Sequence, residues 1–232
     1  GVNWTYDKDT YVLTISVADG NVDGKMADHT KADTEWHKYI LETYGNPKKP
    51  FYVYISDYVE KVVIEEGITH IGNYSFSNCE CLVEVVLPKT VKTIGAHAFD
   101  NSTELVTISG TASNVTSVGA NAFNSTQVMN NGYLQLGNTL FTATEATGDL
   151  DFTGKGITHI ADKAFQNNES ITSVTFDNDL EVIGKSAFAG CTNLNGMVIP
   201  NSVKTIGQYA FQGCTNLKGM VIPNSVKTIG QY

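Results

Sequence analysis

The chain has 232 residues, a length that fits one large domain or two small ones, and its 41% hydrophobic content is ordinary for a folded chain. Asp and Glu number 24 against 15 Lys and Arg, and the densest basic cluster is Lys48-Lys49, so the formal charge of -9 opposes binding to a nucleic-acid backbone. The longest apolar runs, such as Val62–Ile64, are far too short to cross a bilayer, and no apolar signal-peptide core stands at Gly1. Nucleic acid is therefore not expected as a partner, nor is membrane insertion of this segment.

Residues 1–58 form an N-terminal segment that lacks the repeat found further along the chain. Two alternating runs, Trp4–Tyr6 and Tyr11–Ile15, flank a polar turn and predict a β-hairpin. The apolar spacing over Asp33–Tyr44 predicts a helix. Because the first coil of a repeat stack would expose an apolar edge, we interpret the segment as a cap for the repeats.

A short acidic stretch in the same segment resembles the opening of a calcium loop. Asp19, Asn21 and Asp23 alternate, and Gly24 takes the sixth position. Thr30 stands at the twelfth position, where such a loop requires a bidentate Glu. An ordinary Asp/Gly turn explains the same residues. The three residues are thus an incomplete calcium candidate, and the sequence predicts no cofactor.

From residue 59 onward the chain repeats itself. The pattern Ile-Gly-x-x-Ala-Phe, or a close variant, occurs six times, and the spacings between its Phe residues are 23, 24, 42, 23 and 23. Gly190–Tyr209 and Gly213–Tyr232 differ only at Asn195 versus Lys218, which indicates an internal duplication. The six copies end at Phe76, Phe99, Phe123, Phe165, Phe188 and Phe211.

Each repeat is predicted to form one coil of a stack. In the last complete copy, Met197 and Ile199 alternate with polar residues and predict a strand that points them inward. Val203–Ile206 is expected to be a second extended segment, and Gly207–Phe211 a helical turn. One coil cannot bury these side chains alone, but stacked coils share a core in which the Phe residues line up. The predicted fold class is a β-rich, right-handed solenoid over residues 59–232.

The 42-residue spacing between Phe123 and Phe165 exceeds one repeat and predicts an insertion within residues 124–149. Two alternating runs around Gly137-Asn138 are typical of a β-hairpin. The hairpin is expected either to project from the stack or to cap its middle. Both a binding role and a loop without function fit the sequence.

The repeat resembles a known family. Cys191–Phe211, which reads Cys-Thr-Asn-Leu-x-Gly-Met-Val-Ile-Pro-Asn-Ser-Val-Lys-Thr-Ile-Gly-Gln-Tyr-Ala-Phe, is similar to the BspA-like leucine-rich repeats, also called the Treponema-pallidum-type class. Trp4–Tyr6 and Trp36–Tyr39 are similar to the segment that often precedes these repeats in proteins of gut bacteria. Ala161 departs from the pattern, which has Gly at that position.

The resemblance implies a leucine-rich repeat solenoid in a surface-exposed or secreted protein. Members are commonly linked to adhesion, to binding of host matrix proteins or to bacterial coaggregation. The resemblance supplies no catalytic residue and names no ligand.

Nothing in the sequence predicts an enzyme. The histidines are His29, His37, His70, His97 and His159. His70 and His159 share one repeat position, and at ~4.8 Å per coil they would lie about 14 Å apart, too far to share a metal or a proton transfer. No motif places a Cys, Ser or Asp beside any His, so a nucleophilic triad is rejected.

Cys79, Cys191 and Cys214 each follow a repeat Phe by three residues, a position expected to tolerate any small residue. Cys191 and Cys214 would be neighbours with a Cα spacing of ~5 Å, which a disulfide spans. Their side chains should run parallel instead of converging, so free, buried thiols are expected instead of a bond.

The outward residues of the first strand in each coil form the predicted partner-binding face. They would make a shallow stripe, apolar at both ends and hydroxyl-rich between. A stripe with few charges resembles an interface core, although Val and Thr also simply suit strands. The residues are Val63, Glu84, Val86, Thr107, Ser109, Ser173, Thr175, Val198 and Val221.

The sequence thus predicts a non-catalytic, cell-surface or secreted binding or adhesion module that mediates protein–protein interaction. A host extracellular-matrix protein or another cell-surface protein is the expected partner, and the location is extracellular or the bacterial cell surface. The alternative is a structural spacer that presents another domain located beyond Tyr232, because the chain stops in mid-repeat. Self-association through the apolar edge of the last coil is a further option.

Overall fold

The computed structural model describes residues 2–18, 24–27, 58–110, 114–129 and 131–231. The chain divides into two compact units, Gly1–Met129 (unit 1) and Asn130–Tyr232 (unit 2). Both are β-solenoids, and the helix in the described residues is a single short 3-10 segment at Gln127–Met129.

Two predictions for the N-terminal segment lie outside the described residues: the helix over 33–44 and the calcium candidate Asp19, Asn21 and Asp23. The proposed boundary between a cap and a solenoid at residue 58 falls inside unit 1 and stays a prediction.

The N-terminal hairpin is present as predicted. Strand β1 (Val2–Asp7) pairs antiparallel with β2 (Val12–Val17). Asp7 Oδ1 accepts a hydrogen bond from the Asp9 N–H at 2.9 Å and so closes the turn. Strand β2 then pairs in parallel with β3 (Lys61–Ile64), so the hairpin covers the edge of the first coil.

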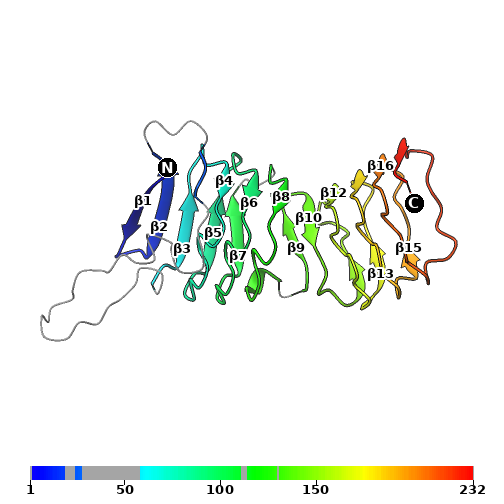
Figure 1. The fold of residues 1–232 in the computed structure, drawn as a ribbon, viewed down its shortest axis with the longest axis horizontal. Helices are drawn as coiled ribbons and strands as arrows, with labels where there is room; N and C mark the ends of the chain where they lie inside the picture. Colours follow the sequence, from blue (N-terminus) through cyan, green and yellow to red (C-terminus); the bar gives the residue numbers. More distant parts are fainter. Residues whose placement is uncertain (1, 19–23, 28–57, 111–113, 130, 232) are drawn as a thin grey trace, which may run out of the picture. The chain divides into compact units, whose positions relative to one another are not determined.

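Unit 1 has two sheets built from short strands of successive coils (Figure 1). In the larger sheet, β3 is followed by β5 (Glu84–Leu87) and β7 (Thr107–Gly110), all in parallel. The smaller sheet contains β4 (His70–Ile71), β6 (Thr93–Ile94) and β8 (Ser117–Val118).

Alternate residues of these strands point into the core, where the repeat Phe side chains stack. The ring centroids of Phe76 and Phe99 lie 5.2 Å apart and those of Phe99 and Phe123 lie 5.0 Å apart, with nearly parallel planes. All three rings are buried. The predicted column is therefore confirmed within unit 1, and it carries much of the apolar burial that stabilises the stack.

The predicted helical turn before each Phe is wrong. The residue two positions before Phe has a positive φ, such as 59° at Tyr209, which a right-handed helix excludes. This turn instead lets the Phe N–H reach the next coil, as from Phe76 to the Ala98 carbonyl at 2.7 Å. Coils are thus joined by a third row of hydrogen bonds. The left-handed residues are Tyr74, His97, Asn121, Lys163, Ser186 and Tyr209.

Unit 2 also has two sheets. The six-stranded sheet has the order β17-β16-β14-β12-β10-β9, and the three-stranded sheet has the order β11-β13-β15. The strands are β9 (Leu134–Leu136), β10 (Thr139–Thr142), β11 (Gly148–Asp151), β12 (His159–Ile160), β13 (Ile171–Thr175), β14 (Val182–Ile183), β15 (Gly196–Met197), β16 (Thr205–Ile206) and β17 (Thr228–Ile229).

The predicted hairpin in this region is formed by β9 and β10, which pair antiparallel. It does not project from the stack, because β10 also pairs in parallel with β12. The Ala143 N–H donates to the Ala164 carbonyl at 2.6 Å, the bond that Phe165 makes to Ala187 in the next coil. The insertion therefore contains a shortened coil, with Ala143 where the others have Phe.

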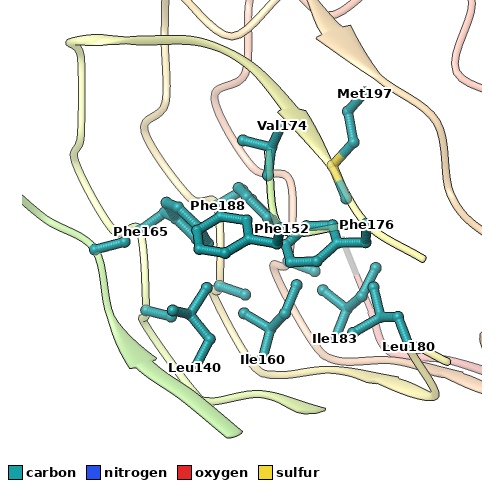
Figure 2. Packing of buried hydrophobic residues seen from close by; sticks show 14 of the residues in the cluster. Leu140, Phe152, Ile160, Phe165, Val174, Phe176, Leu180, Ile183, Phe188 and Met197 are labelled. Atoms are coloured by element: carbon teal, nitrogen blue, oxygen red, sulfur yellow. The ribbon is translucent and has the colours of Figure 1, made fainter. Parts of the chain in front are cut away.

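The core of unit 2 repeats the stacking seen in unit 1 (Figure 2). Phe188 lies between Phe165 and Phe211, with centroid distances of 4.6 Å and 5.3 Å. Phe152 and Phe176 form a second stacked pair at 5.2 Å. Leu140, Ile160 and Ile183 lie on one side of the rings, and Val174 and Met197 lie on the other.

In several copies the side chain three residues after Phe donates a hydrogen bond to the preceding coil, a role that the expected tolerance of any small residue does not include. Ser102 Oγ donates to the Phe76 carbonyl of the preceding coil at 2.8 Å. Cys191 Sγ makes the same bond to the Phe165 carbonyl at 3.0 Å. Burial raises the pKa of the Cys191 thiol to about 12, so it keeps its proton. The cysteines are free, as predicted.

We expect Cys191→Ala to destabilise the chain more than Cys191→Ser. Ala removes the donor, and a net hydrogen bond contributes about 0.5–1.5 kcal/mol, whereas a serine hydroxyl restores the arrangement seen at Ser102. Urea denaturation of both variants, followed by circular dichroism, measures the difference. Equal stability of the two variants would show that this position serves packing alone.

Candidate functional site

The outer face of the larger sheet in unit 1 carries five of the predicted partner-binding residues. Val63 of β3 pairs with Val86 of β5, which in turn pairs with Ser109 of β7. Glu84 pairs with Thr107 in the neighbouring row. None of the five is buried. We call this surface the unit 1 face.

A charged pair borders the two valines of this face. Lys61 Nζ lies 2.9 Å from Glu84 Oε2, and Ser109 Oγ donates to Glu84 Oε1 at 2.6 Å. Both contacts lower the pKa of Glu84 below its usual value, and the contact with Lys61 has the larger effect. Glu84 is therefore ionised at neutral pH and already paired within the face.

Sequence reasoning missed the residues that the hairpin adds to the unit 1 face. Val12 of β2 pairs with Lys61, and Thr14 pairs with Val63, so β2 extends both rows. The signal was present, because the buried Leu13 alternates with outward residues as the strands of the repeats do. The hairpin therefore both caps the first coil and extends its outer face.

The outward residues of unit 2 are more acidic than predicted. Ser173 and Thr175 of β13 lie beside Asp149 and Asp151 of β11. Asp149 Oδ1 accepts hydrogen bonds from Thr172 Oγ1 at 2.6 Å and Ser173 Oγ at 2.7 Å, which lower the pKa of Asp149. The predicted insertion, residues 124–149, includes Asp149, although β11 is the first strand of a coil.

The predicted stripe, apolar at both ends and hydroxyl-rich between, stays a prediction, to which the structure adds acidic neighbours in unit 2. Its unit 1 residues combine two valines with a paired carboxylate, and its unit 2 residues include hydroxyls hydrogen-bonded to Asp149. Val198 and Val221, which hold one position in the duplicated coils, are 81% and 77% exposed. The assignment of these residues to partner binding remains a proposal.

The described histidines each have a local contact. His70 Nδ1 lies 2.6 Å from Thr93 Oγ1, and His159 Nδ1 lies 2.7 Å from Thr158 Oγ1. His97 Nδ1 lies 2.8 Å from Asp100 Oδ2, and its ring stacks on a neighbouring Tyr. Over the part of the chain that the structure covers, no three His, Cys, Asp or Glu side chains gather as a metal site would require.

The repeat pattern identifies the family of the chain. The family model of the BspA type leucine rich repeat region matches residues 49–145 and 134–232, with six copies. The chain belongs to this family. BspA-type repeats are protein–protein interaction modules and are generally non-enzymatic. No curated protein matches the sequence. Among the described residues, no helix has the length and apolar character to span a membrane.

Solved structures of bacterial leucine-rich repeat proteins are similar to this BspA-type chain. A protein from Eubacterium ventriosum is 17% identical over 98% of this chain and 91% of its own, with a TM-score of 0.41. A Treponema pallidum leucine-rich repeat protein is 18% identical over 93% and 87%, with a TM-score of 0.42. The pneumococcal vaccine antigen PcpA is 20% identical over 99% and 76%, with a TM-score of 0.41.

Proposed function

We propose that this BspA-type chain is a non-catalytic binding module, displayed at a bacterial cell surface or secreted, that adheres to a protein partner. The observation that carries the proposal is the unit 1 face, where Val63 and Val86 are paired on neighbouring parallel strands. The partner class is a host extracellular-matrix protein or another cell-surface protein, as the family resemblance implies.

The composition of this face suits a protein interface. Two adjacent valines supply apolar contact area, which association removes from water. Glu84 is already neutralised by Lys61 and hydrogen-bonded by Ser109, so a partner does not have to bury an unpaired charge there. Hydroxyls of Thr14 and Thr107 at the margin provide hydrogen bonds for a polar rim.

The experiment begins with a pull-down of extracellular-matrix and bacterial surface proteins by the purified chain. The affinity of the captured protein is then measured for the wild type and for Val86→Glu, which places an unpaired carboxylate in the centre of the unit 1 face. We expect Val86→Glu to weaken binding at least tenfold, because desolvating an uncompensated charge costs several kcal/mol.

Ser117→Glu is the matched control. Ser117 is exposed on β8 of the other sheet of unit 1, so the variant adds the same charge away from the face and should keep wild-type affinity. An unchanged affinity for Val86→Glu, or equal losses for both variants, would refute binding through the unit 1 face. Failure to capture any protein would favour the spacer function.

A further inference from the structure

Unit 2 contains a hollow of ≈ 440 Å³ between the start of the hairpin and strand β11. Its walls carry three carboxylates, Glu145, Asp149 and Asp151, together with the ring of Tyr133 and the ammonium of Lys155. The hollow lies outside the unit 1 face, and its charged lining is unlike the apolar core beneath it.

Two of the carboxylates are held in place by hydrogen bonds. Asp149 Oδ1 accepts from the hydroxyls of Thr172 and Ser173, and Asp151 Oδ1 accepts from the Thr153 N–H at 2.9 Å. These bonds lower the pKa of both aspartates, so both are ionised at neutral pH. Three carboxylates face one ammonium, and the hollow therefore attracts a further cation.

The ammonium group of Lys155 already lies over an aromatic ring in this hollow. Lys155 Nζ lies 6.0 Å from the centroid of the Tyr133 ring, within the range of a cation–π contact. The Tyr133 ring is fixed by edge-on packing against Phe152, with centroids 5.0 Å apart. The hollow thus combines a rigid aromatic wall with carboxylates, the pair of features that recognises a guanidinium or ammonium group.

A metal ion suits this hollow less well. Within the described residues, the acidic side chains are not close enough together to form a group of three metal ligands. A guanidinium is larger, planar and weakly hydrated, and it satisfies separated carboxylates through several N–H donors while its face lies on an aromatic ring.

We propose that this hollow binds an arginine side chain of the protein partner, an inference that rests on the proposed function of the chain as a protein-binding module. The arginine would donate to Asp149 and Asp151, and its guanidinium would take the place of the Lys155 ammonium at the Tyr133 ring.

The test titrates the full chain with N-acetyl-arginine amide and follows backbone amide chemical shifts by NMR. We expect saturable shifts at Tyr133, Asp149 and Asp151, and none with the neutral isostere N-acetyl-citrulline amide. Asp149→Asn should weaken arginine binding about two- to fivefold, the range of a partly solvated ion pair. Glu181→Gln, which removes one carboxylate elsewhere in unit 2, should leave the affinity unchanged.

Equal binding of arginine and citrulline, no binding of either, or equal effects of Asp149→Asn and Glu181→Gln would overturn the inference. The inference would also fail if a calcium titration shifted the amide signals of these residues and the arginine titration did not. The Asp149→Asn variant keeps an oxygen that can accept the hydrogen bonds from Thr172 and Ser173, so its fold should be unchanged. Tyr133→Leu removes the aromatic ring and should weaken arginine binding independently of the carboxylates. Because the titration uses no partner protein, its failure leaves the Val86→Glu result intact, and the reverse also holds.

Discussion

Phe188→Ala is expected to lower the free energy of unfolding by about 3–5 kcal/mol, the range found when a buried Phe is cut back to Ala. Phe188 is fully buried and lies between two stacked neighbours, so the truncation leaves a cavity and removes two ring contacts at once. Urea denaturation followed by circular dichroism measures the loss.

Phe211→Ala is the matched control for this experiment. This variant carries the same substitution at a position that is only half-buried. In the described column, Phe211 has one stacked neighbour, Phe188. We expect a loss clearly smaller than that of Phe188→Ala. Equal losses would mean that neither the deeper burial of Phe188 nor its second ring contact adds to stability.

Gly184→Ala is expected to destabilise unit 2 by at least about 1–3 kcal/mol, as overpacking does. A methyl group at Gly184 would lie 2.6 Å from the Ala161 carbonyl carbon and 2.6 Å from the Asp162 nitrogen of the preceding coil. These are backbone atoms, so relief requires the two coils to separate. Thermal unfolding of the variant measures the effect.

The natural contrast for Gly184 is Ala161, which holds the same repeat position next to the shortened coil and there keeps its methyl group. Ala161→Gly should therefore change stability only by the backbone freedom of glycine, about 0.5–1 kcal/mol. If Gly184→Ala is as mild as Ala161→Gly, coil spacing does not explain the glycine of the repeat.

The coil and its column of rings could be predicted from the sequence because their causes are periodic. Phe165 and Phe188 recur at a fixed spacing, and only a stack buries both. The left-handed turn before Phe could not be predicted, because most copies place there a residue such as Tyr209, Lys163 or Ser186, for which a positive φ is uncommon. Hydrogen bonds to the next coil impose that conformation, and they leave no local signal.

The candidate site was predictable only in part for a related reason. Alternation along a strand identifies Val63 and Val86 as outward residues. The partners of those residues depend on which segment of the chain is stacked next to them. Asp149 lies beside Ser173 because β11 stacks next to β13, and the coil before β11 has Ala143 in place of Phe, so the spacing of the Phe residues does not reveal this register.

The two near-identical copies in unit 2, Gly190–Tyr209 and Gly213–Tyr232, differ in how deeply the same residue is buried. Ile206 is 4% exposed, whereas its counterpart Ile229 is 61% exposed on β17, the edge strand of its sheet. Each copy carries both the surface that covers its predecessor and the surface that its successor covers. A protein of this type can therefore grow during evolution by copying one 23-residue segment, with no need to invent a new interior.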